Sequence, residues 1–228
     1  MIITIINGSP RKNGSTFKIL NCFKEILENN NSDIKIVFIN LIDYNLKFCL
    51  GCQHCYKMGK CIIIDDHIEE IHETIKNSDG LIFGCPNYAT NVPGLYKNFH
   101  DRVHMTMEQL LYKKPCINII TYENIKMMGI KTLNLMKNMV THAGGYNVNS
   151  MAIKNPFNKD PLNDRIKWKI EKISKKLIKI ILRNKPPLYS IIFTKMVINI
   201  FLKSFVFKNK ENNMGIIKNW KDKNLVKI

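Results

Sequence analysis

The chain is poor in acidic side chains: its 228 residues include 35 Lys and Arg but only 18 Asp and Glu, which gives a formal net charge of +17. An excess of this size often marks a protein that binds nucleic acid or an anionic membrane surface. Here the basic residues are mostly Lys, and they are spread along the chain and become denser only in its last third. The sequence also lacks a recognition motif for DNA or RNA. We therefore expect no nucleic-acid partner.

Targeting signals and nucleotide fingerprints are missing as well. Met1 is followed directly by a strand-like apolar run, without the basic region and cleavage site of a secretory signal. No uninterrupted run of about 18 apolar residues suggests a membrane-spanning helix. Neither the Walker pattern nor G-x-G-x-x-G is present. We expect a cytoplasmic protein, in which seven cysteines, an odd number, favour thiol or metal chemistry over disulfides.

Apolar runs alternate with amphipathic segments over about the first 180 residues. We expect strands at 2–6, 34–39, 80–85, 115–121 and 146–153. We expect helices at 15–29, from 65 onwards, from 93 onwards, at 127–142 and at 160–183. This alternation predicts an α/β fold, a doubly wound five-stranded parallel sheet with helices on both faces.

The adjacent prolines at 186 and 187 divide the chain into a main domain, 1–184, and a C-terminal helical extension, 185–228. Residues 188–207 have helical character and are almost wholly apolar, apart from Ser190, Thr194 and a narrow stripe formed by Lys195, Asn199 and Lys203. A helix this apolar should be covered, by its own domain or by a second subunit. We expect a homo-oligomer. Contact with a membrane surface, to which the lysines could snorkel, is the less favoured alternative.

The loop after the first strand is rich in hydrogen-bond donors. Gly8-Ser9-Pro10-Arg11-Lys12-Asn13-Gly14-Ser15-Thr16 supplies hydroxyls, basic side chains and the start of a helix. A helix N-terminus offers free N–H groups and the positive end of the helix dipole. The loop therefore favours a phosphate site, and the alternative is an ordinary turn with an N-cap.

Four cysteines within the irregular segment 43–65 have the spacing C-x2-C-x2-C-x5-C: Cys49, Cys52, Cys55 and Cys61. Thiolates at these intervals converge if the backbone wraps around a compact centre, which suits a [4Fe–4S] cluster. A zinc site and a set of ordinary thiols are the alternatives. The other cysteines, Cys22, Cys85 and Cys116, are expected in the core. We expect His54 in a solvent-facing loop. The remaining histidines form no metal pattern, and His100 and His104 are expected at the surface.

The first loop resembles the phosphate loop of the flavodoxin-like NAD(P)H-dependent FMN reductases, and Pro86-Asn87-Tyr88-Ala89-Thr90-Asn91-Val92-Pro93 resembles the loop that borders the flavin ring in that family. The resemblance implies FMN as cofactor. It implies phosphate contacts from Ser9, Arg11, Asn13, Ser15 and Thr16, and ring contacts from Pro86, Asn87, Tyr88 and Ala89, with backbone amides at 87–89 facing the ring. A flavin contact is also expected from Thr121, at the end of the fourth strand, and from Tyr122 after it, although the glycine-rich turn usual at this place in the family is absent. The segment around Trp220 resembles the C-terminal end of many members.

The cysteine spacing resembles that of the iron–sulfur flavoproteins within this superfamily. This resemblance implies an FMN-dependent oxidoreductase that passes electrons between flavin and a [4Fe–4S] cluster, with NAD(P)H or a ferredoxin-like protein as possible electron partners. No catalytic acid or base is assigned. A cluster-free NAD(P)H-dependent reductase of flavin or quinones is the second hypothesis, and a zinc-stabilised basic binding module is the third.

Overall fold

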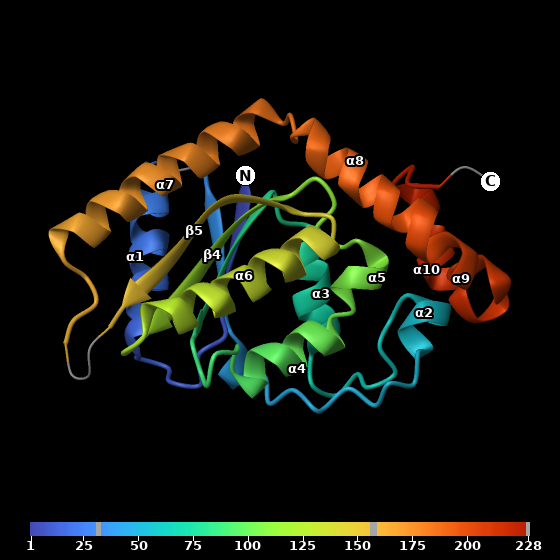
Figure 1. Ribbon diagram of the computed structural model, residues 1–228, viewed down its shortest axis with the longest axis horizontal. Coiled ribbons are helices and arrows are strands. Elements are labelled where there is room, and N and C mark those ends of the chain that lie inside the picture. Colours follow the sequence, from blue (N-terminus) through green and yellow to red (C-terminus); the bar gives the residue numbers. More distant parts are fainter. Residues whose placement is uncertain (31–32, 156–158, 227–228) are drawn as a thin grey trace.

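A five-stranded parallel sheet forms the centre of the computed structural model, which describes residues 1–30, 33–155 and 159–226. The strands are β1 (Ile2–Asn7), β2 (Lys35–Asn40), β3 (Gly80–Pro86), β4 (Pro115–Tyr122) and β5 (Tyr146–Lys154). Their spatial order is β2-β1-β3-β4-β5, so the order reverses between β1 and β3 (Figure 1). This is the flavodoxin-like arrangement, in which ligands bind beyond the carboxyl ends of the strands at the reversal. The predicted doubly wound α/β fold is confirmed.

Helices cover both faces of the sheet. One layer contains α1 (Ser15–Asn30) and α7 (Asp164–Arg183), and the other contains α3 (Ile68–Lys76), α4 (Gly94–Arg102) and α6 (Lys126–His142) (Figure 1). Each layer buries an apolar stripe, represented by Phe23 and Ile173 on one face and by Ile71, Phe99 and Met136 on the other. Every residue of β4 is buried, as its continuous apolar run predicts.

Helix boundaries differ from the sequence expectation at two places. Helix α3 begins at Ile68 rather than at 65, because the residue before it, His67, has a left-handed backbone with a φ angle of 59°. Helix α7 begins at Asp164 rather than at 160. Asn163 caps this end of the helix, because its side chain accepts a hydrogen bond from the Ile166 N–H at 3.0 Å. The segment expected to be irregular contains a 3-10 turn, Leu41–Asp43, and a short helix α2, His54–Met58.

The C-terminal extension forms its own small core. Helix α8 (Leu188–Met196) continues through a π-helical turn, Val197–Leu202, into α9 (Lys203–Lys208), and α10 (Met214–Asp222) follows a short 3-10 turn, Glu211–Asn213. The extension lies beyond one end of the sheet, beside α2 and α5 (Met105–Glu108) (Figure 1). Trp220 is fully buried there and donates its Nε1–H to the Met107 carbonyl oxygen at 2.8 Å. Trp220 therefore anchors α10 to the main domain.

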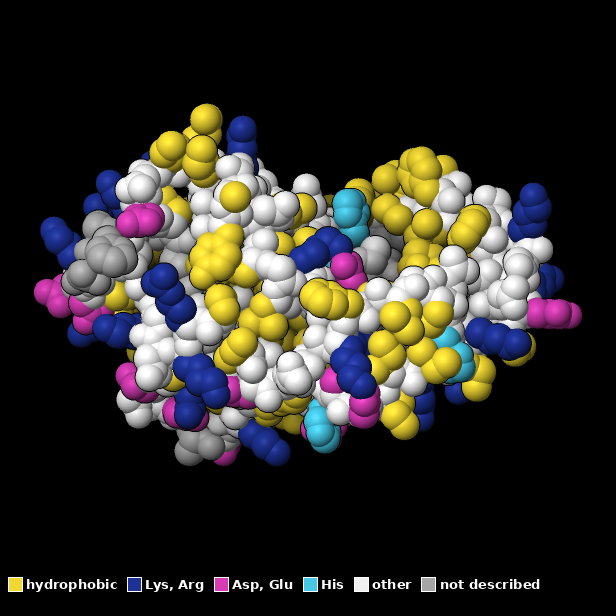
Figure 2. Space-filling view, turned by 90° about the horizontal axis from the view of Figure 1, so that it is seen from below, with side chains coloured by type: hydrophobic (Ala, Val, Ile, Leu, Met, Phe, Trp, Pro, Cys, Tyr) yellow, Lys and Arg dark blue, Asp and Glu magenta, His cyan; other side chains and the backbone are white. Residues whose placement is uncertain are grey.

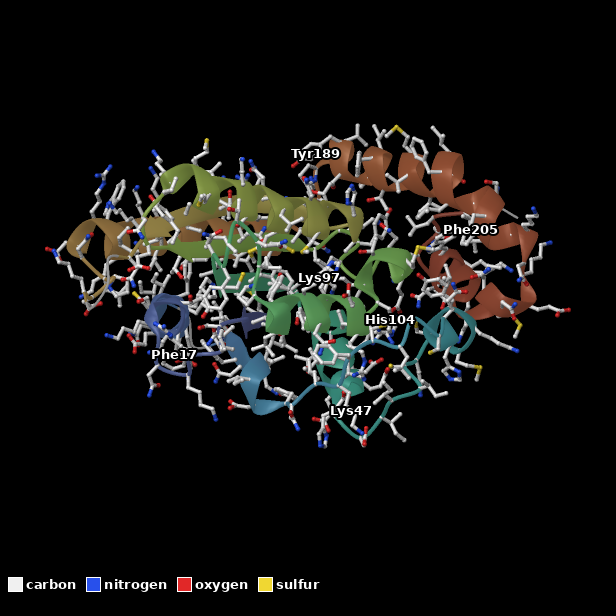
Figure 3. The ribbon with its side chains drawn as sticks, turned by 60° about the horizontal axis from the view of Figure 1, so that its bottom comes forward. Phe17, Lys47, Lys97, His104, Tyr189 and Phe205 are labelled. Carbon is white, nitrogen blue, oxygen red and sulfur yellow. The ribbon has the colours of Figure 1, made fainter. Side chains whose placement is uncertain are left out.

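One face of the α8–α9 helix remains exposed. Its exposed large apolar residues are Leu188, Tyr189, Ile192, Met196, Ile200, Phe201 and Phe205. Figure 2 shows hydrophobic side chains gathered over this helix, and Tyr189 and Phe205 mark its two ends in Figure 3. The helix from Leu188 to Lys208 is long and apolar enough to cross a membrane, with a mean hydropathy of 1.6. This differs from the expectation that the chain has no clear membrane-spanning segment, because a helix passes this test even when Lys195 and Lys203 interrupt its apolar run. The expected cover by a second subunit or, as the less favoured alternative, by a membrane surface stays a prediction.

Candidate functional site

A cavity of about 540 Å³ lies beyond the carboxyl ends of β1, β3 and β4. Its volume is in the range of pockets that hold cofactor-sized ligands. Nine of the ten residues predicted to contact a flavin line it, namely Ser9, Arg11, Asn13, Ser15, Thr16, Pro86, Asn87, Tyr88 and Thr121. The tenth, Ala89, is exposed and is not among the lining residues. The cavity is also lined by Gly14, Lys18, Tyr122, Glu123, Asn155, Lys159 and Asp160.

The first loop is held in shape by its own polar groups. The Ser9 N–H donates to Asn7 Oδ1 at 3.1 Å, and the Arg11 N–H donates to Ser9 Oγ at 3.2 Å. Helix α1 has no acidic side chain in its first turn. Within the described part of the chain, neither Arg11 nor Lys18 has an ion-pair partner, whereas Lys12 pairs with Asp43 at 2.5 Å. Three cations, Arg11, Lys18 and Lys159, and the N-terminus of α1 thus line the cavity with two acidic residues, Glu123 and Asp160. The excess of positive charge suits an anion such as a phosphate.

Gly8 allows this loop to begin close to α4. A Cβ atom at Gly8 would lie 2.4 Å from Tyr96 Cδ2, a separation that real side chains do not reach. Tyr96 is itself buried, and the Gly8 N–H donates to the Gly84 carbonyl oxygen at 2.7 Å. A larger residue at position 8 would push the loop away from the sheet edge.

The loop after β3 forms a tight turn. Tyr88 and Asn91 exchange two backbone hydrogen bonds of 2.9 Å, and Ala89 and Thr90 both have positive φ angles, 47° and 65°. Positive φ at both central positions is the signature of a type I′ turn. The Asn87 N–H donates to the Thr121 carbonyl oxygen at 2.7 Å. The N–H groups of Asn87 and Tyr88 thus already donate hydrogen bonds to main-chain oxygens. This structure differs from the expectation that these two N–H groups face the flavin ring.

The loop after β4 joins the first loop through hydroxyl groups. Thr121 Oγ1 and Thr16 Oγ1 are 2.8 Å apart and both residues are buried, so this hydrogen bond holds the end of β4 against the start of α1. Tyr122 packs on Gly129 of α6, where a Cβ would lie 2.6 Å from the Tyr122 ring. Gly129 therefore lets α6 lie close to the Tyr122 ring.

Asn155 is a cavity residue that sequence reasoning missed. Its side-chain Oδ1 is buried without a hydrogen-bond partner among the described residues, while its N–H donates to the Tyr122 carbonyl oxygen at 2.7 Å. The signal was available, because Asn155 directly follows β5 and the carboxyl ends of parallel strands meet at one edge. FMN carries donors, in its ribityl hydroxyls and its ring N–H, that such an acceptor would pair with. The anion site and this acceptor together fit FMN.

The cysteine segment is closed at its base by α4. Asn98 Nδ2 donates to the Leu46 carbonyl oxygen at 2.9 Å, and Arg102 donates to the carbonyl oxygens of Lys47 at 2.5 Å and Ile63 at 3.1 Å. Lys47 precedes the first of the four cysteines and Ile63 follows the last. These hydrogen bonds therefore hold the segment that enters the cysteine loop beside the segment that leaves it.

The four thiols lie close enough to influence one another. Burial, and then the charges of Cys61, Cys49 and Cys52, raise the pKa of Cys55 to about 12. A cavity of about 360 Å³ is lined by Cys49 and Cys55 together with His100 and His104. Gly51 and Gly59 have φ angles of +63° and +68°, which let the backbone bend around the thiols. All seven cysteines are free thiols, and Cys22, Cys85 and Cys116 are buried, as predicted.

The four cysteines supply four thiolates from one short loop. An iron–sulfur cube takes one thiolate at each of its four irons. The number and kind of these ligands therefore fit a [4Fe–4S] cluster, and a four-cysteine zinc site takes the same number.

Helix α4 connects the two cavities. Pro93, which begins the helix, belongs to the loop that carries Tyr88 to the first cavity, while His100 and Asp101 line the cysteine cavity. Helix α4 has nine residues, a rise of about 13 Å. Helix α4 thus has the loop of the first cavity before its N-terminus and the cysteine cavity beside its last turn.

Comparison with known proteins gives consistent matches. The model of the NADPH-dependent FMN reductase family matches residues 1–157. An iron-sulfur flavoprotein of Clostridioides difficile is 46% identical over 227 residues, which are 99% of this chain and 100% of that protein. An iron-sulfur flavoprotein of Methanosarcina thermophila is 34% identical over 102 residues, 45% of this chain and 52% of that protein.

Solved structures show the same fold at low sequence identity. The apo form of an NADH:FMN oxidoreductase matches with a TM-score of 0.58 at 17% identity and covers 83% of this chain and 92% of that one. An FMN-dependent NADH-azoreductase from Bacillus anthracis, in complex with FMN, matches with a TM-score of 0.60 at 15% identity and covers 79% of this chain and 100% of that one. At these identities the likeness concerns the fold alone.

Proposed function

As the chain belongs to the NADPH-dependent FMN reductase family, we propose that this FMN-dependent oxidoreductase also holds a [4Fe–4S] cluster on Cys49, Cys52, Cys55 and Cys61 and passes electrons between flavin and cluster. The observation that carries this proposal is the cysteine loop itself. Its base is closed by Arg102 and Asn98, and its thiols are close enough for three of them to raise the pKa of the fourth. The whole-length relative named an iron-sulfur flavoprotein supports the same assignment.

The chain's own residues would bind FMN and orient it in the cavity. Arg11, Lys18 and the N-terminus of α1 would hold the FMN phosphate, and Asn155 would accept a hydrogen bond from the ribityl chain or the ring. When bound, FMN exchanges one or two electrons and the cluster exchanges one at a time. No side chain is assigned as a general acid or base. NAD(P)H and a ferredoxin-like protein remain the proposed electron partners.

A cluster-free NAD(P)H-dependent reductase is the second candidate. It is favoured by one observation, that the flavin cavity is complete without the cysteines, since none of them lines it. The third hypothesis, a zinc-stabilised binding module without catalysis, is set aside because the family consists of oxidoreductases.

Single serine variants of the four loop cysteines test the proposal. After anaerobic purification, the wild type should contain about four iron and four acid-labile sulfide per chain. Each variant should lose most of both while keeping its FMN. The control is Cys22→Ala, a buried thiol of α1 outside the loop, which should keep its iron. A wild type that carries FMN but no iron would support the cluster-free reductase instead.

A further inference from the structure

Two histidines and one glutamate, His72, His104 and Glu108, meet in the interior between α3, α5 and α10. His72 Nε2 lies 2.5 Å from Glu108 Oε2, and His104 Nδ1 lies 3.2 Å from the same oxygen. All three side chains are at least 94% buried. Figure 3 shows His104 between the end of α4 and the extension. The expectation that the histidines form no metal pattern and that His104 lies at the surface is therefore wrong.

We propose that His72, His104 and Glu108 bind a divalent transition-metal ion, Zn²⁺ or Fe²⁺, at a site distinct from the four cysteines. Their ligand atoms all lie within 4.8 Å of one another. Two imidazoles and one carboxylate are the ligand set that both ions accept in proteins. The residues are 36 and 4 positions apart in the sequence, so only the packing of α3 against α5 brings them together.

The carboxylate of Glu108 has an outer partner of the kind found around metal ions, whereas each histidine keeps one buried ring nitrogen without a hydrogen bond among the described residues. Asn219 of α10 donates a hydrogen bond to Glu108 Oε1, the carboxylate oxygen that the histidines do not contact. His72 Nδ1 is buried without a hydrogen bond among the described residues, and Glu73 Oε1 lies 3.7 Å from it. Metal-bound histidines usually turn their second ring nitrogen toward a carboxylate, and metal-bound carboxylates are usually hydrogen-bonded in turn. A small movement of Glu73 would complete this arrangement.

The geometry needs little adjustment to admit an ion. Ligands at about 2.0 to 2.2 Å from a tetrahedral metal lie about 3.3 to 3.6 Å apart. His104 Nδ1 and Glu108 Oε2, at 3.2 Å, are close to this spacing, whereas His72 Nε2 and Glu108 Oε2, at 2.5 Å, must separate by about 1 Å. A void of about 10 Å³ borders His104, Glu108 and Asn219 on one side and Cys55 on the other, and His72 does not line it. That volume is close to the minimum for one water molecule, which would serve as the fourth ligand.

The nearby lysine, Lys223, does not form an ion pair with the Glu108 carboxylate, which leaves that carboxylate free to bind a metal ion. Lys223 donates to the main-chain oxygen of Glu108 and to Asn219 Oδ1, each at 2.8 Å, so it does not neutralise the carboxylate. His104 Nε2 has no hydrogen-bond partner within the described chain. The void is too small for a substrate, so the ion would have a structural role. It would join α3 to α5 and, through Asn219, fasten the C-terminal extension beside the cysteine loop.

Anomalous diffraction from crystals of the full chain soaked in Zn²⁺ tests this directly. Data collected at the zinc edge should show a peak bonded to His72, His104 and Glu108. A peak found only at the cysteines, or none, would overturn the assignment. The measurement needs no variant and does not depend on the [4Fe–4S] cluster.

Zinc binding in solution provides the second test. A variant with Ser at all four loop cysteines should still bind one Zn²⁺ per chain by equilibrium dialysis. Adding His72→Gln or His104→Gln should weaken that binding at least tenfold. The matched control is His67→Gln, which changes the exposed histidine just before α3, whose side chain pairs with Glu70. Equal zinc binding in all of these variants would overturn the assignment.

Discussion

Arg102 and Asp66 form a buried, two-pronged ion pair at the base of the cysteine loop. Nη1 donates to Oδ2 at 2.5 Å and Nη2 donates to Oδ1 at 3.0 Å, and the two side chains are 0% and 3% exposed. The Lys47 N–H donates to the same carboxylate at 2.9 Å. Because Lys47 and Asp66 lie on opposite sides of the four cysteines, this one ion pair sets the width of the loop's base.

Removing the guanidinium should open the loop. We expect Arg102→Met to lower the free energy of unfolding by about 3 to 5 kcal/mol, because the buried Asp66 carboxylate loses its partner. Urea unfolding measures this loss, and iron content should fall while FMN content is kept at temperatures where the variant is folded. The exposed Arg165→Met is the control and should be neutral. Unchanged stability and iron in Arg102→Met would contradict the assigned role.

The pH dependence of stability should show the same ion pair. Burial alone would raise the pKa of Asp66, but the hydrogen bonds from Arg102 and the Lys47 N–H outweigh it and hold that pKa below its ordinary value. A carboxylate of this kind contributes stability above its unfolded pKa, about 3.9, and loses it as the pH falls through the lower folded value.

Asp66→Asn tests this dependence. The variant should be less stable than the wild type at pH 7, and the difference should shrink below about pH 4. Unfolding by urea at a series of pH values measures both. A difference that does not change with pH would mean that Asp66 acts only through its shape.

The phosphate site predicts a selective loss of affinity. Arg11→Ala should weaken FMN binding by about ten- to a hundredfold, the value of a charge-assisted hydrogen bond. Binding of riboflavin, which lacks the phosphate, should not change. Fluorescence titration of flavin-free protein measures both constants. Lys12→Ala is the control, because Lys12 pairs with Asp43 and does not line the cavity. Equal losses for FMN and riboflavin would mean that Arg11 acts on the ring instead.

Gly8→Ala should damage the same site through packing. Because the new Cβ would meet Tyr96 at 2.4 Å, we expect a stability loss of about 1 to 3 kcal/mol and weaker FMN binding. Gly94→Ala is the matched control, since a Cβ there meets nothing within 4 Å. Thermal unfolding of the two variants decides the point, and a Gly8→Ala protein as stable as Gly94→Ala would show that the loop can move freely.

The parts of the fold that depend on residues close together in the sequence were predictable. The continuous apolar run of β4 and the strand–loop–helix around Gly8 need only local patterns, and the reversal of strand order then brings the loops of β1, β3 and β4 together. Ala89 was expected at the cavity but is exposed, because it lies in a type I′ turn. The usual sequence signal for such a turn is a glycine at its centre, and this turn has none. His72 and Glu108 could not be joined from sequence, because their contact depends on how two short helices pack.

An anaerobic visible absorption spectrum of the purified protein, recorded before and after dithionite, tests the central claim most directly. We predict the two bands of oxidised flavin, and between them a broad absorption that dithionite bleaches, which an iron–sulfur cluster adds. Iron and FMN measured on the same sample should be present at about four to one. Flavin bands alone, with no iron, would contradict the account and leave Cys49, Cys52, Cys55 and Cys61 as ordinary thiols of a cluster-free FMN reductase.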